Sequence, residues 1–371
     1  MSRFYALDRL RALAVVSMVQ GHTFSALLAE DALPRWLMQV HALAHGLTAP
    51  AFLLGAGLAF GLATYPRYEL YSQIGDAFVA RMRRYGALIV LGYALQLPGS
   101  SLLMAFRMRS QDLTPVFRVG PLHLIAFCLL VCQLGTLALR SPRLHAAAAL
   151  ALGILVTIAA PYVYAAEAGQ GAGRVLGAWL DASSGSLFPI FPWAGFVFFG
   201  VALGGVLAQR NAELPRAAVW LLLGVLLAGS AYLMFRLGVR LSDPQWFWHA
   251  SPLNVLFRVG LVLFVLGLLH RLPAPAPNST GPGWTALLAR HSLVAFVTHL
   301  LLLYGTPFSP SLHKHFALQL TAPEASAVFV AIMGLTLLAI GAWVALSAAR
   351  RLELGWVRVL LTALGVLVLM R

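Results

Sequence analysis

Residues 217–237 read AAVWLLLGVLLAGSAYLMFRL, and their central block at 222–233, LLGVLLAGSAYL, contains no charged side chain. A run of about 20 apolar residues is the length that an α-helix needs to cross the hydrocarbon of a bilayer. A second block at 88–97, LIVLGYALQL, has the same character. These stretches predict membrane-spanning helices and an all-α fold, because a helix satisfies its own backbone hydrogen bonds in lipid.

The composition agrees with a membrane protein. Of 371 residues, 60% are hydrophobic and only 10% are charged, whereas a soluble surface needs about 25–35% charged residues. The net charge of +14 comes from 26 basic and 12 acidic residues, and in a soluble protein it would suggest a nucleic-acid partner. Because the charges here separate apolar runs, we expect contact with membrane lipid and no nucleic acid.

The apolar windows predict a polytopic integral membrane protein, a bundle of about 10–11 transmembrane helices around a central cavity. We expect the whole chain, 1–371, to form a single membrane domain. The last window is short and contains Arg358, which is typical of a partial or tilted helix. The windows lie at 7–29, 42–63, 86–106, 121–139, 145–164, 188–208, 217–237, 252–270, 285–304, 324–347 and 355–370.

Arginine placement predicts the orientation in the membrane. If successive loops face alternate sides, most arginines lie on the side of the amino terminus, and positively charged loops stay in the cytoplasm. All but one of the 26 basic residues are arginines, the exception being Lys314, which is typical of a GC-rich bacterial genome. We therefore expect a bacterial cytoplasmic (inner) membrane, with the amino terminus in the cytoplasm.

The first span carries the most informative polar residues, Asp8, Arg11, His22 and Ser25. Eleven residues at 100° each end about 20° past three full turns, so Arg11 and His22 share one face, about 16 Å apart along the axis. Arg11 near the cytoplasmic interface is suited to hold phosphate, and His22 in the outer half is suited to act as a base. The simpler interpretation is an interfacial Asp8–Arg11 ion pair, with His22 hydrogen-bonded to a neighbouring helix.

Further histidines favour a shared cavity. His299 lies at a position in its span that corresponds to His22, and both spans run from inside to outside, so we expect the two imidazoles at similar depth. His41 and His45 lie at the outer mouth of the second span, and His123 lies near the outer start of the fourth. A zinc site is conceivable, but no HExxH-type pattern accompanies these histidines, so we expect no metal.

Prolines and glycines mark two packing features. The segment at 187–193, LFPIFPW, places two prolines three residues apart at the outer end of the sixth span. Proline interrupts helical hydrogen bonding, which predicts a bent, packed turn that lines a cavity mouth; the alternative is an ordinary aromatic anchor at the interface. Gly55, Gly57 and Gly61 predict close approach of another helix. The two cysteines, Cys128 and Cys132, share a helix face and are expected in buried packing.

Five motifs resemble membrane acyltransferases of the acyltransferase type three superfamily, and more closely its heparan-α-glucosaminide N-acetyltransferase-like branch. They occur in the expected order over about 290 residues. The motifs are LDRLRALAVVSMVQGH at 7–22, LTAPAFLLGAGLAFG at 47–61, FRVGPLHLIAF at 117–127, FPIFPWAGFVFFG at 188–200 and LLARHSLVAFVTH at 287–299.

The resemblance implies a transferase that moves an acyl group, most simply acetyl, from cytoplasmic acyl-CoA to a sugar hydroxyl or amine at the outer side, a form of glycan modification. It implies His22 as the catalytic histidine and His299 as a second cavity histidine. We expect donor phosphates near Arg11, Arg81, Arg83, Arg84 and Arg290, and acceptor contacts from His45, His123, Arg118 and Trp193.

Two departures from the family pattern bear on substrate contacts. The family often has an acidic residue directly before the proline–tryptophan motif, whereas here the nearest acid is Asp181, six residues before Leu187. His123 stands where the animal enzymes have Gln-Arg. We therefore expect contacts with the acceptor that differ from those of the animal enzymes.

Two chemical routes and two other classes of protein stay open. His22 either deprotonates the acceptor for direct attack on the thioester or carries the acyl group as an acyl-histidine. Alternatively the chain is a transporter or flippase of a glycan or lipid-linked sugar, without acyl chemistry, or a non-enzymatic membrane scaffold. The spans contain no interior acid, which disfavours proton-coupled transport.

Overall fold

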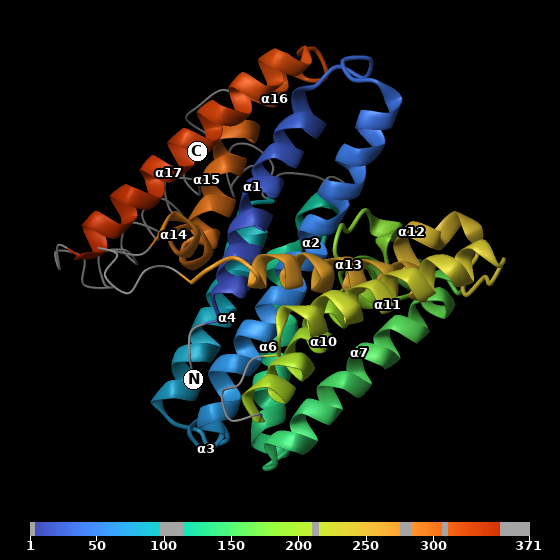
Figure 1. Cartoon of the computed structure of the whole chain (residues 1–371), viewed down its shortest axis with the longest axis vertical. Helices are drawn as coiled ribbons and strands as arrows, with labels where there is room; N and C mark the ends of the chain where they lie inside the picture. Colours follow the sequence, from blue (N-terminus) through green and yellow to red (C-terminus); the bar gives the residue numbers. More distant parts are fainter. Residues whose placement is uncertain (1–3, 97–113, 210–214, 275–282, 306–310, 349–371) are drawn as a thin grey trace. The chain divides into compact units, whose positions relative to one another are not determined.

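The computed structural model describes residues 4–96, 114–209, 215–274, 283–305 and 311–348 (Figure 1). Within these ranges the regular elements are helices. The one pairing of extended backbone in the same ranges is an isolated parallel bridge between Leu28 and Leu320. The predicted all-α fold is therefore confirmed.

Seven helices in the described ranges are long and apolar enough to cross a membrane, or eight if one bent pair counts as a single span. Each overlaps a window predicted from the sequence, which confirms a polytopic membrane protein. The seven are Arg35–Tyr71, which contains α2 (Arg35–Thr64), then α6 (Pro121–Ala138), α7 (Pro142–Ala165), α10 (Ile190–Gln209), α11 (Ala217–Arg236), α13 (Pro252–His270) and the segment Ala322–Ser347 of α17 (Ala322–Ala348).

Two predicted spans are helical without reaching that hydropathy. Helix α1 (Tyr5–Leu27) carries Arg11 and His22, and α4 (Asp76–Ala94) carries three arginines, so both average too polar. Ten or eleven spans are predicted, and seven or eight are found in the described ranges. The difference comes from these two helices and from windows that lie outside the described residues. The second half of the window at 86–106 and the window at 355–370 lie outside the described residues.

The ninth predicted span is broken rather than continuous. Helix α14 (Trp284–Arg290) and helix α15 (Ser292–Tyr304) meet at an angle of 79°. The break lies at His291, whose φ of −109° and ψ of 25° are not helical. The span predicted at 285–304 therefore consists of two helical segments, because one residue with non-helical dihedrals ends the first of them.

The described chain divides into two compact units, each considered by itself. Among the described residues, unit 1 comprises 4–10, 49–96, 114–209 and 215–273, and unit 2 comprises 11–48, 274, 283–305 and 311–348. The expectation of a single domain stays a prediction. In unit 1, α11 packs along α13, α10 along α7, and α4 along α6 (Figure 1).

Glycines allow the close packing of α2 on α10 within unit 1. A Cβ on Gly61 would lie 2.7 Å from the Cα of Gly204, and one on Gly57 would lie 2.0 Å from the carbonyl oxygen of Val197. Both distances are shorter than carbon contacts allow, so neither position accepts a larger residue without moving backbone. The predicted close approach at these glycines is confirmed.

The proline-rich start of α10 is bent, as predicted. Phe191 has φ of −93° and ψ of 120°, outside the helical region, and the Phe191–Pro192 peptide is cis. In the neighbouring α6, Cys128 and Cys132 are both buried and free, which confirms their packing role. The bend places Trp193 at the first regular turn of α10.

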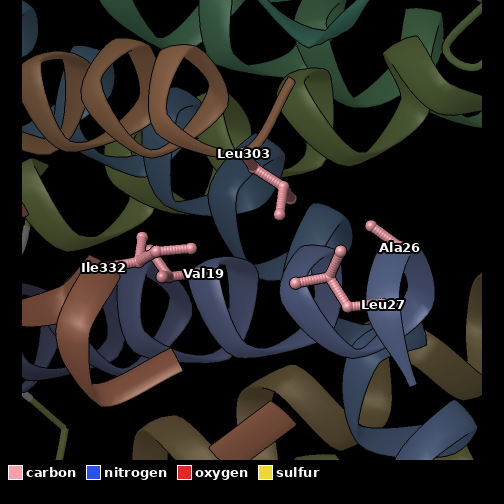
Figure 2. Close-up of a cluster of buried hydrophobic side chains, with 5 residues drawn as sticks. All are labelled: Val19, Ala26, Leu27, Leu303 and Ile332. Atoms are coloured by element: carbon pink, nitrogen blue, oxygen red, sulfur yellow. The ribbon is translucent and has the colours of Figure 1, made fainter. Parts of the chain in front are cut away.

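Unit 2 contains the histidine-bearing part of α1, the start of α2, and α14, α15, α16 (Leu312–Phe316) and α17. Figure 2 shows its buried core, made by side chains of α1, α15 and α17. These side chains are Val19, Ala26, Leu27, Leu303 and Ile332. The core fixes α1 against α15 on both sides of His22 in the sequence, so it determines where the His22 ring lies.

Candidate functional site

His22 of α1 and His299 of α15 form a direct hydrogen-bonded pair. The Nδ1 atom of His22 lies 2.8 Å from the Nε2 atom of His299. The ring centroids are 5.1 Å apart with planes only 19° from parallel. His299 is 1% exposed, and His22 is partly buried. The two imidazoles predicted at similar depth are therefore in contact, whereas the roles assigned to them stay predictions.

The backbone of α15 determines which nitrogens of this pair carry protons. The Nδ1 atom of His299 lies 2.8 Å from the carbonyl oxygen of Ala295, one turn earlier, and a carbonyl only accepts. His299 Nδ1 must therefore donate, which leaves Nε2 of a neutral His299 as an acceptor. His22 Nδ1 then donates to it, and a neutral His22 keeps the lone pair of its Nε2 atom. This tautomer is inferred from the hydrogen-bond partners.

Two more histidines of unit 2 lie beside this pair. The His45 ring meets the His22 ring edge-on, with centroids 5.8 Å apart, and the His41 ring lies parallel to that of His45 at 6.1 Å. Gln20 donates to Nδ1 of His41 over 3.2 Å. A Cβ on Gly21 would stand 1.8 Å from His45 Nδ1, so glycine before His22 makes room for this ring.

The hydrogen bonds of the histidine cluster favour proton transfer. Among the described residues, no three His, Cys, Asp or Glu side chains are arranged to hold a metal ion. In the pair itself, one facing nitrogen of His22 and one of His299 are already engaged with each other. The arrangement supports acid–base chemistry at the remaining nitrogen of His22.

Arg11 contacts the same helix as His22 does. Its Nη2 atom donates to Oγ of Ser292, at the first residue of α15, over 3.2 Å. The Arg11–Ser292 and His22–His299 contacts advance along both helices in the same chain direction, as expected of two spans with one orientation. Arg290, exposed at the end of α14, also belongs to unit 2. Phosphate binding by both arginines stays a prediction.

The other arginines expected at the donor belong to unit 1. The Nη1 atom of Arg81 donates to Oγ1 of Thr64 over 2.9 Å and to Oε1 of Gln133 over 2.8 Å. Its guanidinium carbon lies 3.4 Å from the centroid of the Tyr71 ring. All three partners are uncharged, so they hold the guanidinium without neutralising its charge. Arg83 and Arg84 are exposed.

Three residues expected at the acceptor also belong to unit 1. His123 is fully buried, and its Nδ1 atom accepts from the backbone N–H of Gly120 over 3.1 Å. Its Nε2 atom has no hydrogen-bond partner among the described residues. Arg118 is exposed, and Trp193 is partly buried with its ring 4.9 Å from Phe188. Their roles toward an acceptor stay predictions, as does that of His45.

Two residues gain roles that the sequence analysis did not give them. Asp181 is 2% exposed and accepts from the backbone N–H of Gly169 and of Ser183, over 2.7 and 2.8 Å, so it holds a turn together. Arg258 lies in α13 with its guanidinium carbon 5.6 Å from the Trp193 ring centroid. The signal for Arg258 was present, because an arginine inside an apolar span is rare and costly.

Apolar helices and a buried, hydrogen-bonded histidine pair define an all-α polytopic membrane protein with a site suited to proton transfer. A family model described as heparan-alpha-glucosaminide N-acetyltransferase, catalytic, matches residues 3–237. The chain therefore belongs to this family of membrane acetyltransferases. No curated protein and no solved structure matches the chain. The matched range includes His22 and ends before Arg258 and His299.

Proposed function

We propose that the chain transfers an acetyl group from acetyl-CoA to a hydroxyl or amine of a sugar, with His22 as the general base. The observation that carries this proposal is the chain of hydrogen bonds from the Ala295 carbonyl through His299 to His22. It leaves the Nε2 atom of His22 as a proton acceptor that is oriented by its neighbours. The chain belongs to an acetyltransferase family, which indicates that the transferred group is acetyl.

The proton and electron pairs balance without any further reagent. As the acceptor oxygen or nitrogen attacks the thioester carbonyl carbon, its proton passes to His22 Nε2. The tetrahedral intermediate then collapses with cleavage of the carbon–sulfur bond. The CoA thiolate takes the proton from the His22 imidazolium, so the products are an acetylated sugar and CoA with a free thiol. His299 stabilises that imidazolium through the hydrogen bond at His22 Nδ1.

His299 acts in this scheme as a positioning residue, because its Nε2 atom is engaged with His22. Its Nδ1–H bond to its own helix fixes the ring, and the ring fixes the tautomer and orientation of His22. The neighbouring His45 is proposed to contact the acceptor, since its ring lies edge-on to that of His22. His123, Arg118 and Trp193 are proposed to extend the acceptor site.

The donor is proposed to enter from the cytoplasm, with its phosphates held by arginines. Arg11 is the first of these, since it lies on the His22 face of α1, about 16 Å away by helix geometry. A pantetheine arm spans such a distance when extended. Arg290 of unit 2, and Arg81, Arg83 and Arg84 of unit 1, are proposed to add positive charge for the phosphates. The protein is proposed to lie in a bacterial inner membrane with its amino terminus in the cytoplasm.

The test is release of CoA by the purified full chain in lipid nanodiscs, supplied with acetyl-CoA and glucosamine. We expect a free thiol to appear together with acetylated sugar, and His22→Ala to lower kcat by about 10²–10⁴-fold, the usual contribution of a general base. His315→Ala removes an exposed histidine of α16 and serves as the matched control. A transporter or flippase releases no CoA, and that result would overturn the proposal.

A single-turnover experiment separates direct transfer from an acyl-histidine. The protein is mixed with acetyl-labelled acetyl-CoA without acceptor, quenched, and examined for label on protein. We expect none, because direct attack forms no bond between the acetyl group and His22. Stoichiometric label that is absent from His22→Ala would instead establish the covalent route.

A further inference from the structure

Arg258 is a charged residue inside an apolar helix, and the described residues offer it no counter-ion. It lies six residues after Pro252 in α13, and neither α13 nor α10 contains an acidic residue. Within the described ranges, no side chain or carbonyl accepts a hydrogen bond from its guanidinium. A guanidinium in a membrane span costs several kcal/mol unless it is paired or faces a polar cavity, so an arginine here calls for a ligand or a polar contact.

One side of this guanidinium is occupied by an aromatic ring. The guanidinium carbon lies 5.6 Å from the centroid of Trp193. Trp193 is itself held between Phe188 and Phe196, at 4.9 and 5.9 Å between ring centroids. A cation over an indole face is stabilised by the ring quadrupole, but this contact uses none of the five N–H donors of arginine. The donors therefore stay available for an oxyanion.

A second polar side chain on α13 has one acceptor atom without a hydrogen-bond partner among the described residues. Asn254 precedes Arg258 by four residues, so both lie on the same side of the helix. It is 4% exposed, and its Nδ2 atom donates to the carbonyl of Trp248 over 3.0 Å. Its Oδ1 atom is buried with no hydrogen-bond partner in the described part of the chain. This acceptor complements the donors of Arg258.

We propose that Arg258, Asn254 and Trp193 bind a sugar ring that carries an acidic group. The oxyanion takes the N–H donors of Arg258, a hydroxyl of the ring donates to Asn254 Oδ1, and the Trp193 ring holds the guanidinium beside them. The proposal rests on the proposed function, since the acidic sugar belongs to the acceptor. It assigns the site a preference for acidic over neutral acceptors.

The position of the site agrees with the acceptor side in the proposed orientation. At 1.5 Å per residue, Arg258 lies about 9 Å from the start of α13. Trp193 likewise lies near the start of α10. With a cytoplasmic amino terminus, both helices start at the outer face, where the acceptor is expected. The same oxyanion chemistry could come from a phosphate of CoA or from a lipid headgroup, so the experiment includes both.

The experiment measures binding to the full chain in phosphatidylcholine nanodiscs by titration calorimetry, with glucuronic acid, its methyl ester and CoA as probes. We expect glucuronic acid to bind about 10–100-fold more tightly than the methyl ester, since the ester removes only the charge. This comparison uses the unmodified protein, so it does not depend on a variant that folds. Rising salt is expected to reduce the difference.

Variants then assign the charge to Arg258. Arg258→Gln is expected to abolish the preference for the acid, and Arg258→Lys to retain part of it, because lysine lacks the planar fork. Arg143→Gln removes an exposed arginine of α7 and is expected to have no effect. Equal binding of acid and ester would overturn the proposal. So would loss of CoA binding in Arg258→Gln with the acid preference intact, which would assign the oxyanion to the donor.

The lipid source is distinguished by native mass spectrometry of the protein with added phosphatidylglycerol. The wild type could retain this lipid while Arg258→Gln loses it, and glucuronic acid could show no preference over its ester. These two results together would assign the site to a lipid headgroup and overturn the proposal. The proposed function fails separately. If glucuronic acid is preferred but no CoA is released from acetyl-CoA, the acidic-sugar site is supported and the transferase function is refuted. If CoA is released without a preference for glucuronic acid, the transferase function is supported and the acidic-sugar site is refuted.

Discussion

Replacing His299 by leucine removes the acceptor of the His22 Nδ1–H hydrogen bond while keeping an apolar side chain of similar size. The bond is 2.8 Å long and its acceptor residue is 1% exposed. A donor left without a partner in such a place costs about 1–3 kcal/mol. If this cost falls on the reacting arrangement of His22, kcat drops by about 5–150-fold. KM for acetyl-CoA should change little, because His299 contacts His22 and not the donor.

The variant His299→Gln tests the physical reason for this loss. A glutamine side chain reaches about as far as Nε2 of histidine, and its Oε1 atom accepts a hydrogen bond. We therefore expect it to restore most of the activity lost in the leucine variant. Steady-state CoA release gives kcat and KM, and thermal unfolding in the same nanodiscs identifies any variant that has lost its fold.

Two results would refute this reasoning about His299. The first is a folded His299→Leu protein with wild-type kcat, since the hydrogen bond would then have no effect on the reaction. The second is a glutamine variant as slow as the leucine variant. That result would mean that His299 must itself carry a proton, and that accepting a hydrogen bond from His22 is not enough.

Three further predictions concern packing, a turn and the donor. Gly61→Ala should force the backbones of two helices apart, which costs about 1–3 kcal/mol of stability and lowers the unfolding temperature. Gly229 has open space around it, so Gly229→Ala should leave that temperature unchanged or raise it. Thermal unfolding of both variants tests this difference. Asp181→Ala should also lower that temperature but leave kcat per folded molecule within about twofold, because the partners of Asp181 among the described residues are backbone N–H groups. Arg81→Gln should raise KM for acetyl-CoA about tenfold with kcat unchanged, and Arg81→Lys should raise it less; equal effects of both would contradict a role for the charge.

The arrangement of helices along the chain follows closely from the apolar runs. The window at 217–237 became α11 at Ala217–Arg236, because a stretch of this length without interior charge has no other stable form in lipid. The break at His291 could not be predicted in this way. The residues before it, at 287–290, are good helix formers, and the break is a change of two backbone dihedrals that leaves the hydrophobic pattern intact.

The site was predictable in part. Helical spacing and span direction were enough to place His22 and His299 at one depth, and these two rings are in contact. The bond from His299 to Ala295 depends on one side-chain rotamer, which no spacing rule specifies. Arg258 is visible as the only arginine in its span, but an isolated cation has no spacing or motif that assigns it a ligand.

The contact between His299 and the carbonyl of Ala295 has a consequence for engineering. The carbonyl that fixes the tautomer of His299 lies four residues earlier on the same helix, within the sequence AFVTH. A designer who places these residues on another helix and packs the histidine in the same rotamer would obtain an imidazole with a preset lone pair. Because that bond is made within one helix, a loop substitution that keeps α15 in place should not change which nitrogen of His299 accepts.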